Sequence, residues 1–285
     1  MTAARMRWDA YETVDGVLCK PGRQEERTAF SQETADRLLR IEDVSWWFQY
    51  RMELIAQIAD RFLAKEKAVF DIGGGNGYTS KALQQRGWEA VLLEPSLPEC
   101  RNANMRGVQT VVCNALNAQD FPAESVPQAV LLDVLEHIEQ ETVMLELLHD
   151  SVQSGGAVVL TVPAYRCLWS SEDDAAGHFR RYRRDELVQH LEAAGFKVEY
   201  STYFFSFLWL PILLLRAGAE RIGFLKRADE RTEEEKRRVQ DKQFRHPGWL
   251  VDHVLRCCER IEQTRILSGK RMPFGSSVLA VARKL

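Results

Sequence analysis

Hydrophobic residues fall into short runs that alternate with segments of helical spacing along the middle of the chain. The runs predict strands at 68–72, 89–93, 109–113, 129–132, 157–162 and 196–200. Between them, apolar residues spaced three and four apart predict helices at about 77–86, 96–105, 140–153 and 185–194. Strands and helices that alternate in this way are typical of a parallel, doubly wound α/β sheet.

The residues before the first strand are expected to form an N-terminal helical lid over 1–50. One helix is predicted from Ser31 to Val44, and an aromatic cluster from Trp46 to Tyr50 leads into a second. Such clusters usually pack in a core. The alternative is a lid over a ligand, in which Tyr50 or the planar guanidinium of Arg51 would reach a carboxylate.

The residues after the sixth strand are expected to hold an apolar and helical insertion, 205–274, so that the core comprises 51–204 plus 275–285. An apolar stretch from Tyr203 to Leu215 opens this part, and it is shorter than the about 20 residues that cross a membrane. It is interpreted as a buried cap, as the subunit interface of a homodimer, or as a surface for a membrane or a lipid substrate. A buried cap over the active site is the first choice, and the basic residues nearby add support to the last interpretation.

A further helix is predicted at 249–267, and the closing segment from Gly275 predicts a seventh, antiparallel strand beside the sixth.

Composition and charge narrow the classes of function. The chain has 285 residues, of which 45% are hydrophobic and 28% charged, as in a soluble globular protein. A net charge of −3 gives no basic footprint for nucleic acid, so no nucleic-acid partner is expected. The six cysteines show no metal-ligand spacing, so no metal site is predicted, and they fit a reducing compartment. We expect a cytoplasmic protein, with peripheral contact to the inner face of the membrane if the apolar stretch meets lipid.

A glycine-rich turn follows the first strand and reads Asp71-Ile72-Gly73-Gly74-Gly75-Asn76-Gly77. Glycines let a ligand approach the main chain, and the helix that begins after them directs free N–H groups and a positive dipole end at the turn. The third glycine comes one position earlier than in the dinucleotide fingerprint G-x-G-x-x-G. An Asp two residues before the first glycine disfavours a pyrophosphate and suits a ligand with an ammonium group. This D-x-G-x-G-x-G pattern resembles the first motif of class I S-adenosylmethionine (SAM)-dependent methyltransferases.

Three later strand ends extend the resemblance, which covers residues 46–204 plus 275–285. Glu94, followed by Pro95, lies about 20 residues beyond the glycine turn, where an acidic residue binds ribose hydroxyls; NAD enzymes share this feature. Asn114-Ala115 stands where the family often has an Asp that accepts a hydrogen bond from the adenine amino group, and an Asn carbonyl can accept the same bond. Asp133-Val134-Leu135-Glu136-His137 resembles the family motif after the fourth strand.

The resemblance implies a Rossmann-like, seven-stranded methyltransferase sheet and SAM as the cofactor. The residues expected to bind SAM are Tyr50, Arg51, Asp71, Gly73, Gly75, Asn76, Gly77, Glu94, Pro95, Asn114, Ala115, Asp133 and Val134. His137 and His178 are the candidate general bases, because a neutral imidazole can take a proton from the attacking group. Their alternative role is structural. Trp169, Arg181 and Tyr182, in the loop after the fifth strand, are expected to touch the substrate.

The expected function is transfer of the sulfonium methyl group to an oxygen, carbon or nitrogen of a small-molecule or lipid/isoprenoid-linked acceptor. Two alternatives stay open at this point. An NAD-dependent oxidoreductase would share the glycine turn and Glu94, but it would bind NAD(H) and not SAM. A non-catalytic SAM-binding protein would bind the cofactor and transfer no methyl group.

Overall fold

The computed structural model describes residues 8, 10–22, 32–223 and 248–285, together with 227, 230, 232 and 235. Its strands are β1 (Glu12–Val14), β2 (Val17–Cys19), β3 (Val69–Ile72), β4 (Ala90–Glu94), β5 (Thr110–Cys113), β6 (Ala129–Leu132), β7 (Ala157–Pro163), β8 (Phe196–Phe204) and β9 (Ser277–Lys284). Its longer helices are α1 (Gln32–Glu42), α2 (Trp46–Phe62), α3 (Tyr78–Gln85), α4 (Leu97–Met105), α5 (Glu141–Ser151), α7 (Arg184–Ala193) and α11 (Trp249–Leu267). The shorter helical segments are η2 (Leu135–His137), η3 (Arg166–Leu168), α6 (Ser171–Ala176), α8 (Ser206–Ile212), η4 (Leu213–Gly218) and α9 (Ala219–Arg221).

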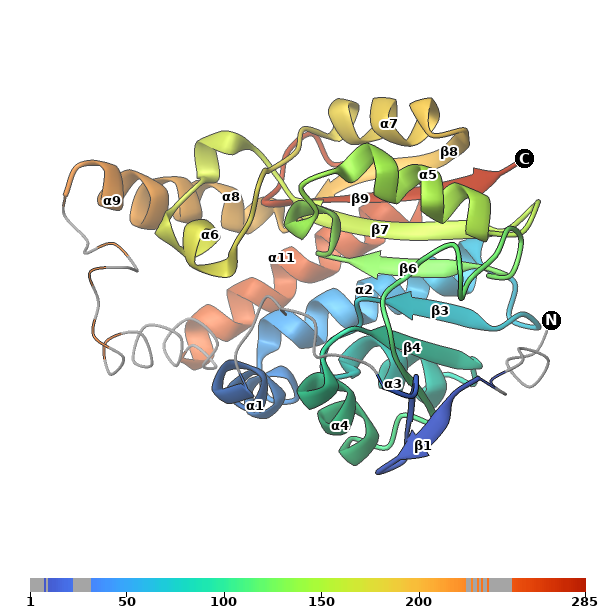
Figure 1. Cartoon of the computed structure of the whole chain (residues 1–285). Coiled ribbons are helices and arrows are strands. Elements are labelled where there is room, and N and C mark those ends of the chain that lie inside the picture. Colours follow the sequence, from blue (N-terminus) through green and yellow to red (C-terminus); the bar gives the residue numbers. More distant parts are fainter. Residues whose placement is uncertain are drawn as a thin grey trace.

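All nine strands form one sheet in the order β1-β2-β5-β4-β3-β6-β7-β9-β8 (Figure 1). Strands β5, β4, β3, β6 and β7 are parallel, and β9 lies antiparallel between β7 and β8. The predicted parallel α/β sheet with a last antiparallel strand is therefore confirmed. The chain winds from β3 toward β5 and then returns to β6 on the other side. This topological switch point, between β3 and β6, is where such sheets bind ligands.

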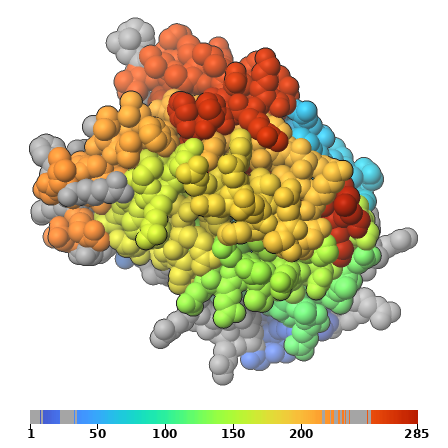
Figure 2. Space-filling model, turned by 90° about the horizontal axis from the view of Figure 1, so that it is seen from above, coloured from blue at the N-terminus to red at the C-terminus, as the bar shows by residue number. Residues whose placement is uncertain are grey.

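Helices cover both faces of the sheet. The strand residues alternate between the two faces, as their period of two requires. In β3, Phe70 and Ile72 pack into the core beneath α5 and α7, whereas Val69 packs into the core toward α2 and α3. Figure 2, seen from above, shows the green atoms of the α5 region and the gold atoms of the α7 region side by side on this side of the molecule. Because both faces are buried, the parallel strands read as apolar runs.

The sheet extends beyond the seven predicted strands by a hairpin, β1–β2, at the β5 edge. Asp15 and Gly16 form its turn, with φ of 52° and 79°. Asp-Gly is among the strongest two-residue hairpin signals, because both central residues need positive φ. The prediction that residues 1–50 are helical is therefore wrong for the two strands β1 and β2, and the helix expected from Ser31 to Val44 is present as α1. Residues 1–7, 9 and 23–31 of the expected lid lie outside the described residues.

The expected insertion is only partly a buried cap. Phe204 and Phe205 are fully buried, but none of the α8 residues is buried, and Leu210, Leu214 and Ile222 are exposed. Helix α11 crosses back against α2, as Figure 1 shows. Within the described residues, no helix is both long and apolar enough to span a membrane. The charged segment 236–247 lies outside the described residues.

Candidate active site

The glycine turn closes tightly against the end of β6. Gly73 and Gly75 have φ of 70° and 52°, in the left-handed region that favours glycine. A Cβ atom on Gly73 would lie 2.7 Å from Cγ2 of Val134. The main chain after β3 is thus held against the residue that follows Asp133, and the two strand ends of the switch point form one surface.

Two predicted ligand residues support this turn from beneath. Asp71 is 1% exposed and accepts a hydrogen bond from Ser80 Oγ at 2.7 Å. Burial raises the pKa of Asp71 to about 6, against the hydrogen bonds from Ser80 and the charge of Arg51. Asn76 is also buried, and its amide donates to the Ala35 carbonyl at 3.0 Å. Both side chains brace the turn, and the expectation that they contact the ligand directly is corrected.

Gly77 serves the packing of helices. It begins α3 with φ of 74°, and an added Cβ would lie 2.7 Å from Cβ of Ala103 in α4. The third glycine of the motif therefore permits close approach of α3 and α4.

Glu94 lies at the end of β4, directly over the turn. Its Oε2 accepts from the Gly75 N–H at 3.0 Å, and its Oε1 accepts from the Ser96 N–H at 2.8 Å. Each carboxylate oxygen keeps a second lone pair. Burial, together with the neighbouring Glu99 carboxylate, raises the pKa of Glu94 to about 8. Pro95 follows as the bend into Ser96, the N-cap residue of α4.

The N-terminal hairpin supplies contacts at Asn114 that the sequence did not reveal. The Asn114 amide donates to the Tyr11 hydroxyl oxygen at 2.7 Å and to Asp120 Oδ2 at 2.8 Å. Its side-chain carbonyl accepts from the Ala115 N–H at 2.9 Å and keeps one lone pair. Lys20 pairs with Asp120. Tyr11 and Lys20 thereby fix the side chain expected to meet adenine.

Arg51 reaches the end of β6, as expected, whereas Tyr50 does not. One Arg51 nitrogen, Nη2, lies 2.8 Å from both Asp133 Oδ2 and Thr161 Oγ1. Its Nε is buried and has no hydrogen-bond partner among the described residues. The Tyr50 hydroxyl donates to Glu262 at 2.7 Å, so this tyrosine ties α2 to α11. The prediction that Tyr50 meets a ligand carboxylate is corrected.

The segment after β7, expected to be a loop, contains the short helix α6. Ser170 N–H donates to Asp173 Oδ2 at 2.9 Å, which caps the start of α6, and Gly177 ends it with φ of 73°. The chain then turns back, so that the His178 N–H donates to the Asp173 carbonyl and the Phe179 N–H donates to the Glu136 carbonyl. These bonds place His178 beside η2.

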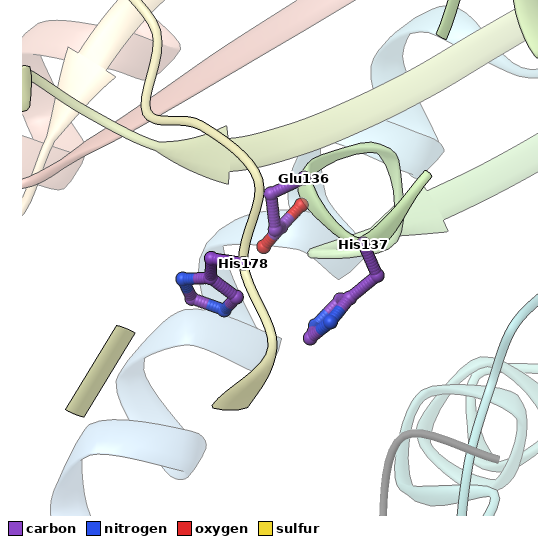
Figure 3. A group of neighbouring side chains, drawn as sticks. All are labelled: Glu136, His137 and His178. Carbon is purple, nitrogen blue, oxygen red and sulfur yellow. The ribbon is translucent and has the colours of Figure 1, made fainter. Parts of the chain in front are cut away.

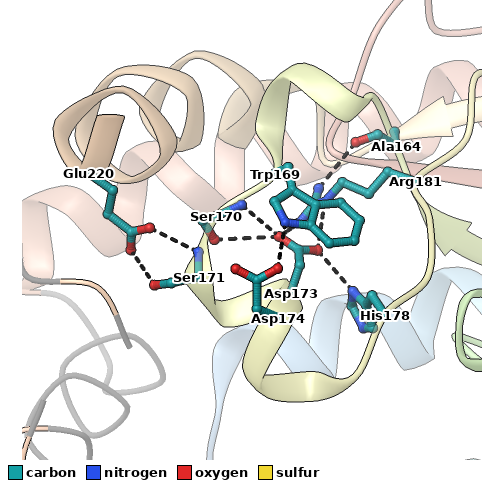
Figure 4. A network of polar contacts seen from close by, with 9 residues as sticks. All are labelled: Ala164, Trp169, Ser170, Ser171, Asp173, Asp174, His178, Arg181 and Glu220. Atoms are coloured by element: carbon teal, nitrogen blue, oxygen red, sulfur yellow. Dashed lines mark hydrogen bonds and ion pairs between the residues drawn. The ribbon is translucent and has the colours of Figure 1, made fainter. Parts of the chain in front are cut away.

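Asp173 is the centre of a polar network drawn in Figure 4. Its Oδ1 lies 2.8 Å from Nδ1 of His178 and 2.7 Å from Nε of Arg181. Burial alone would raise the pKa of Asp173, but the bonds from His178 and Arg181 lower it well below its usual value. Arg181 also donates to the Ala164 carbonyl. Its guanidinium is therefore held by the fold, and the expected contact of Arg181 with the substrate stays a prediction.

The other two residues expected to touch the substrate, Tyr182 and Trp169, lie in different environments. Tyr182 is 2% exposed and donates to Glu141 at 2.5 Å, so it is a core residue and not a substrate contact. Trp169 is half-buried beside the network, with its indole N–H donating to Asp174 at 2.9 Å. Trp169 therefore stays a candidate for contact with the substrate.

Glu136, His137 and His178 converge on one point (Figure 3). One ligand atom from each lies within 4.8 Å of the others, and the two imidazole centroids are 4.8 Å apart. Glu136 is fully buried, and neither carboxylate oxygen has a hydrogen-bond partner among the described residues. Burial, then the charge of Asp133, raises its pKa well above the usual value. Burial and the neighbouring His178 lower the pKa of His137 to about 4.

The sequence profile of a methyltransferase domain family matches residues 46–201, more than half of the chain. The chain belongs to this family. The predicted class I SAM-dependent methyltransferase is thereby confirmed, and with it SAM as the cofactor. No curated protein matches this methyltransferase.

Solved structures share the fold of this methyltransferase at low sequence identity. Phosphoethanolamine N-methyltransferase 2 of Haemonchus contortus, in complex with SAM, has a TM-score of 0.55 and 17% identity over 90% of this chain and 58% of its own. A chain in the complex between the Haloferax volcanii Trm112 methyltransferase activator and a methyltransferase has a TM-score of 0.54 and 16% identity over 88% of this chain and 94% of its own. The [4+2]-cyclase SpnF has a TM-score of 0.53 and 16% identity over 90% of this chain and 97% of its own. A cyclase on the same fold means that the likeness identifies the architecture and not the reaction.

Proposed function

We propose that this methyltransferase binds SAM across the switch point and transfers its methyl group to a small acceptor held near His137 and His178. The observation that carries the proposal is the Glu94 carboxylate at the glycine turn, 3.0 Å from the Gly75 nitrogen. Its remaining lone pairs suit two ribose hydroxyls. The free carbonyl lone pair of Asn114, next along the sheet edge, suits the adenine amino group.

The residues at the end of β6 fit the methionine end of the cofactor. Arg51 is the cation of this region, and its buried Nε lacks a partner among the described residues. A buried donor without a partner costs about 1–3 kcal/mol, which a carboxylate acceptor would remove. Asp133 Oδ2 lies 2.8 Å from Arg51 and is half-exposed, which suits an ammonium group. The proposed orientation therefore runs from Asn114 at the adenine to Arg51 at the carboxylate.

When bound, SAM supplies a methyl group on a sulfonium that is already electrophilic. The protein has to position the acceptor behind that methyl group and exclude water. His178 is held by Asp173, and a carboxylate only accepts, so Nδ1 carries a proton and Nε2 is the available nitrogen. We propose that His178 or His137 takes the proton of an acceptor that must lose one.

We propose a lipid-linked or isoprenoid-linked acceptor as the finer assignment. Helix α6 is fixed to α9 through Ser171, whose N–H and hydroxyl both bond Glu220, at 2.9 and 3.0 Å. The exposed apolar residues Leu210 and Leu214 belong to the same α8–α9 segment. An apolar surface beside the loop that carries His178 suits an acceptor with a hydrocarbon tail.

Cofactor binding tests the proposal. Calorimetry with S-adenosylhomocysteine should show one site per chain, and NAD(H) should give no heat. Glu94→Ala should weaken the binding at least tenfold, whereas Glu124→Ala, a surface carboxylate far from the turn, should leave it unchanged. Saturation by NAD(H) without binding of S-adenosylhomocysteine would contradict the proposal.

Acceptor class is tested with SAM labelled at the methyl carbon. The protein is incubated with the polar and the organic fraction of a cell extract, and the labelled product is located by partition. Label in the organic fraction supports the lipid-linked acceptor. Label in the aqueous fraction alone rejects that assignment and keeps methyl transfer, and label in neither fraction favours a non-catalytic SAM-binding protein.

A further inference from the structure

The strongest feature outside the proposed cofactor site is the convergence of Glu136, His137 and His178. We propose that these three side chains form a binding site for a divalent transition-metal ion of the zinc type. Their ligand atoms lie within 4.8 Å of one another, and the side chains come from two segments, η2 and the turn after α6. Figure 3 shows the carboxylate directed toward the space between the two rings.

The donor set matches that kind of ion. Two imidazole nitrogens and one carboxylate oxygen are ligands of Zn²⁺, Fe²⁺ and related ions, whereas Mg²⁺ and Ca²⁺ prefer oxygen alone. Ligands around tetrahedral Zn²⁺ at about 2.0–2.1 Å lie about 3.3 Å apart. Each pair of ligand atoms must therefore close by at most about 1.5 Å, which rotation of the half-buried His137 side chain and of the Glu136 carboxylate toward the fixed His178 ring can supply.

Both histidines have the outer partners that metal-binding histidines use. Such residues donate the second ring N–H to a carboxylate or a backbone carbonyl, which fixes the tautomer and turns the other nitrogen toward the ion. His178 has the Asp173 carboxylate at 2.8 Å from Nδ1. His137 has a hydrogen bond with the backbone of Ala176. Asp173 is in turn fixed by Arg181 at 2.7 Å, so the orientation of His178 is set before any ion binds.

Glu136 supplies the second, independent indication of a ligand. A fully buried carboxylate normally has hydrogen-bond donors, yet neither Glu136 oxygen receives a hydrogen bond from another of the described residues, and its own backbone N–H lowers its pKa less than burial raises it. The nearby cations are already engaged, Arg51 by Asp133 and Arg181 by Asp173. A metal ion between Glu136 and the two rings would give this carboxylate a partner.

The site has a consequence for the acceptor, and this step rests on the proposed function. With three protein ligands, a four-coordinate ion keeps one open position. An acceptor hydroxyl bound there would have a lowered pKa, and its proton would leave to solvent. The histidines would then act as ligands and not as bases, and the preferred acceptor would be a hydroxyl compound.

Zinc binding by the full chain tests the site without any methyl transfer. Tag-free protein is stripped with EDTA, dialysed and titrated with ZnCl₂ against a chromophoric chelator. We expect one Zn²⁺ per chain, bound at least tenfold more tightly than Mg²⁺. His178→Ala and Glu136→Gln should each weaken zinc binding at least tenfold, whereas His253→Ala, which removes an exposed histidine of α11, should leave it unchanged. The Co²⁺-loaded protein should show visible absorption bands that His178→Ala removes.

Equal zinc affinity and stoichiometry in the wild type, His137→Ala and His178→Ala would overturn the proposal, as would the absence of binding in the wild type. If Glu136→Gln fails to fold by circular dichroism, the two histidine variants decide, because both side chains are only half-buried. S-adenosylhomocysteine binding by the stripped protein is measured in parallel. If the protein binds S-adenosylhomocysteine but shows no zinc site, only the metal proposal is rejected, and the proposed methyltransferase function stands.

Discussion

Nδ1 of His178 lies 2.8 Å from Oδ1 of Asp173, in a bond that the Gly177 turn makes possible. The bond fixes the ring beside Glu136 and His137 and assigns the proton to Nδ1, since a carboxylate only accepts. His178 thus presents one unprotonated nitrogen of defined direction. That nitrogen can take a proton or bind a metal ion, and the two uses are distinguished by the zinc titration.

The first prediction concerns turnover. His178→Ala and His137→Ala should each lower methyl transfer about 10²- to 10⁴-fold if they act as general bases, because positioned acid–base groups contribute about that much. Affinity for S-adenosylhomocysteine should stay within about twofold, since neither ring is part of the proposed cofactor site. Transfer is measured with the acceptor that the labelling experiment identifies. Unchanged turnover in both variants would remove the two histidines from the chemistry.

Arg51 should recognise the carboxylate of the cofactor. Arg51→Ala should weaken S-adenosylhomocysteine about tenfold or more, but it should barely affect 5′-methylthioadenosine, which lacks the amino-acid end. Charge-assisted hydrogen bonds contribute about 1.5–3 kcal/mol, which corresponds to that loss. Calorimetry with both ligands checks this. Tyr50→Phe is the neighbouring control and should leave both affinities unchanged, because its hydroxyl bonds Glu262. An equal loss for both ligands in Arg51→Ala would contradict the orientation.

Stability should fall as pH rises toward 8. Burial and the nearby Glu99 raise the pKa of Glu94 to about 8, from an ordinary value of 4.5, and burial raises that of Asp71 to about 6. Between pH 4.5 and about 8 the folded protein keeps the Glu94 proton, which the unfolded chain has released, and Asp71 keeps its proton in the same way up to about pH 6. The free energy of unfolding therefore decreases as the pH rises through this range. Each such carboxyl group contributes a slope of about 1.4 kcal/mol per pH unit.

Urea unfolding of the ligand-free protein at pH 5, 6.5 and 8 measures this slope. Glu94→Gln should flatten it between pH 6.5 and 8, even though the variant loses an acceptor and is less stable throughout. A Glu94→Gln protein with the slope of the wild type would show that another group titrates in this range.

The order of strands and the glycine turn were predictable because their physical signals are local. Short continuous apolar runs, a helix start after glycine and the acidic end of β4 need only neighbouring residues to be recognised. The orientation of Asp71 and Tyr50 was not predictable in this way. Asp71 turns beneath the glycines to Ser80, and Tyr50 turns to Glu262, which is 212 residues away in the chain.

The cluster of Glu136, His137 and His178 illustrates the same limit. No regular spacing connects the two segments, because a short helix, α6, and its end at Gly177 fold His178 back to η2. The signals for α6 were nonetheless present, since Ser170 and Asp173 form a capping pair and Gly177 ends the helix. The Asp15-Gly16 hairpin was likewise visible in the sequence. The hydrogen bonds from Arg181 and Tyr182 to acidic residues were not.

Glu262 should be a major determinant of stability. It is 1% exposed and accepts hydrogen bonds from the Tyr50 hydroxyl, the Phe205 N–H and both donors of Ser206. Glu262→Ala would leave buried donors unsatisfied and should cost about 3–5 kcal/mol. Thermal unfolding measures this loss. Arg256→Ala, on the exposed side of the same helix, should leave the melting temperature unchanged. A loss below about 1 kcal/mol for Glu262→Ala would show that α11 does not hold α2 and α8 in place.

The contact between Gly73 and Val134 allows a rescue experiment at the glycine turn. Gly73→Ala places a methyl group 2.7 Å from Val134 Cγ2 at a φ of 70°, so it suffers both a clash and backbone strain. Gly155→Ala, at a φ of 74° with open space around it, suffers the strain alone, about 1 kcal/mol. Gly73→Ala should therefore be the less stable variant in urea and should bind S-adenosylhomocysteine at least tenfold more weakly than the wild type.

Adding Val134→Ala to Gly73→Ala removes the methyl groups that cause the clash, so part of the lost stability should return, and the difference from Gly155→Ala should shrink. Val134→Ala alone controls for the loss of its own packing. The double-mutant cycle gives the coupling between the two residues, which direct contact should make larger than about 0.5 kcal/mol. Additive effects would mean that the ends of β3 and β6 do not touch in solution. In that case the two strand ends would not form one surface for the cofactor, and the affinity of the protein for S-adenosylhomocysteine should not depend on Gly73 or Val134.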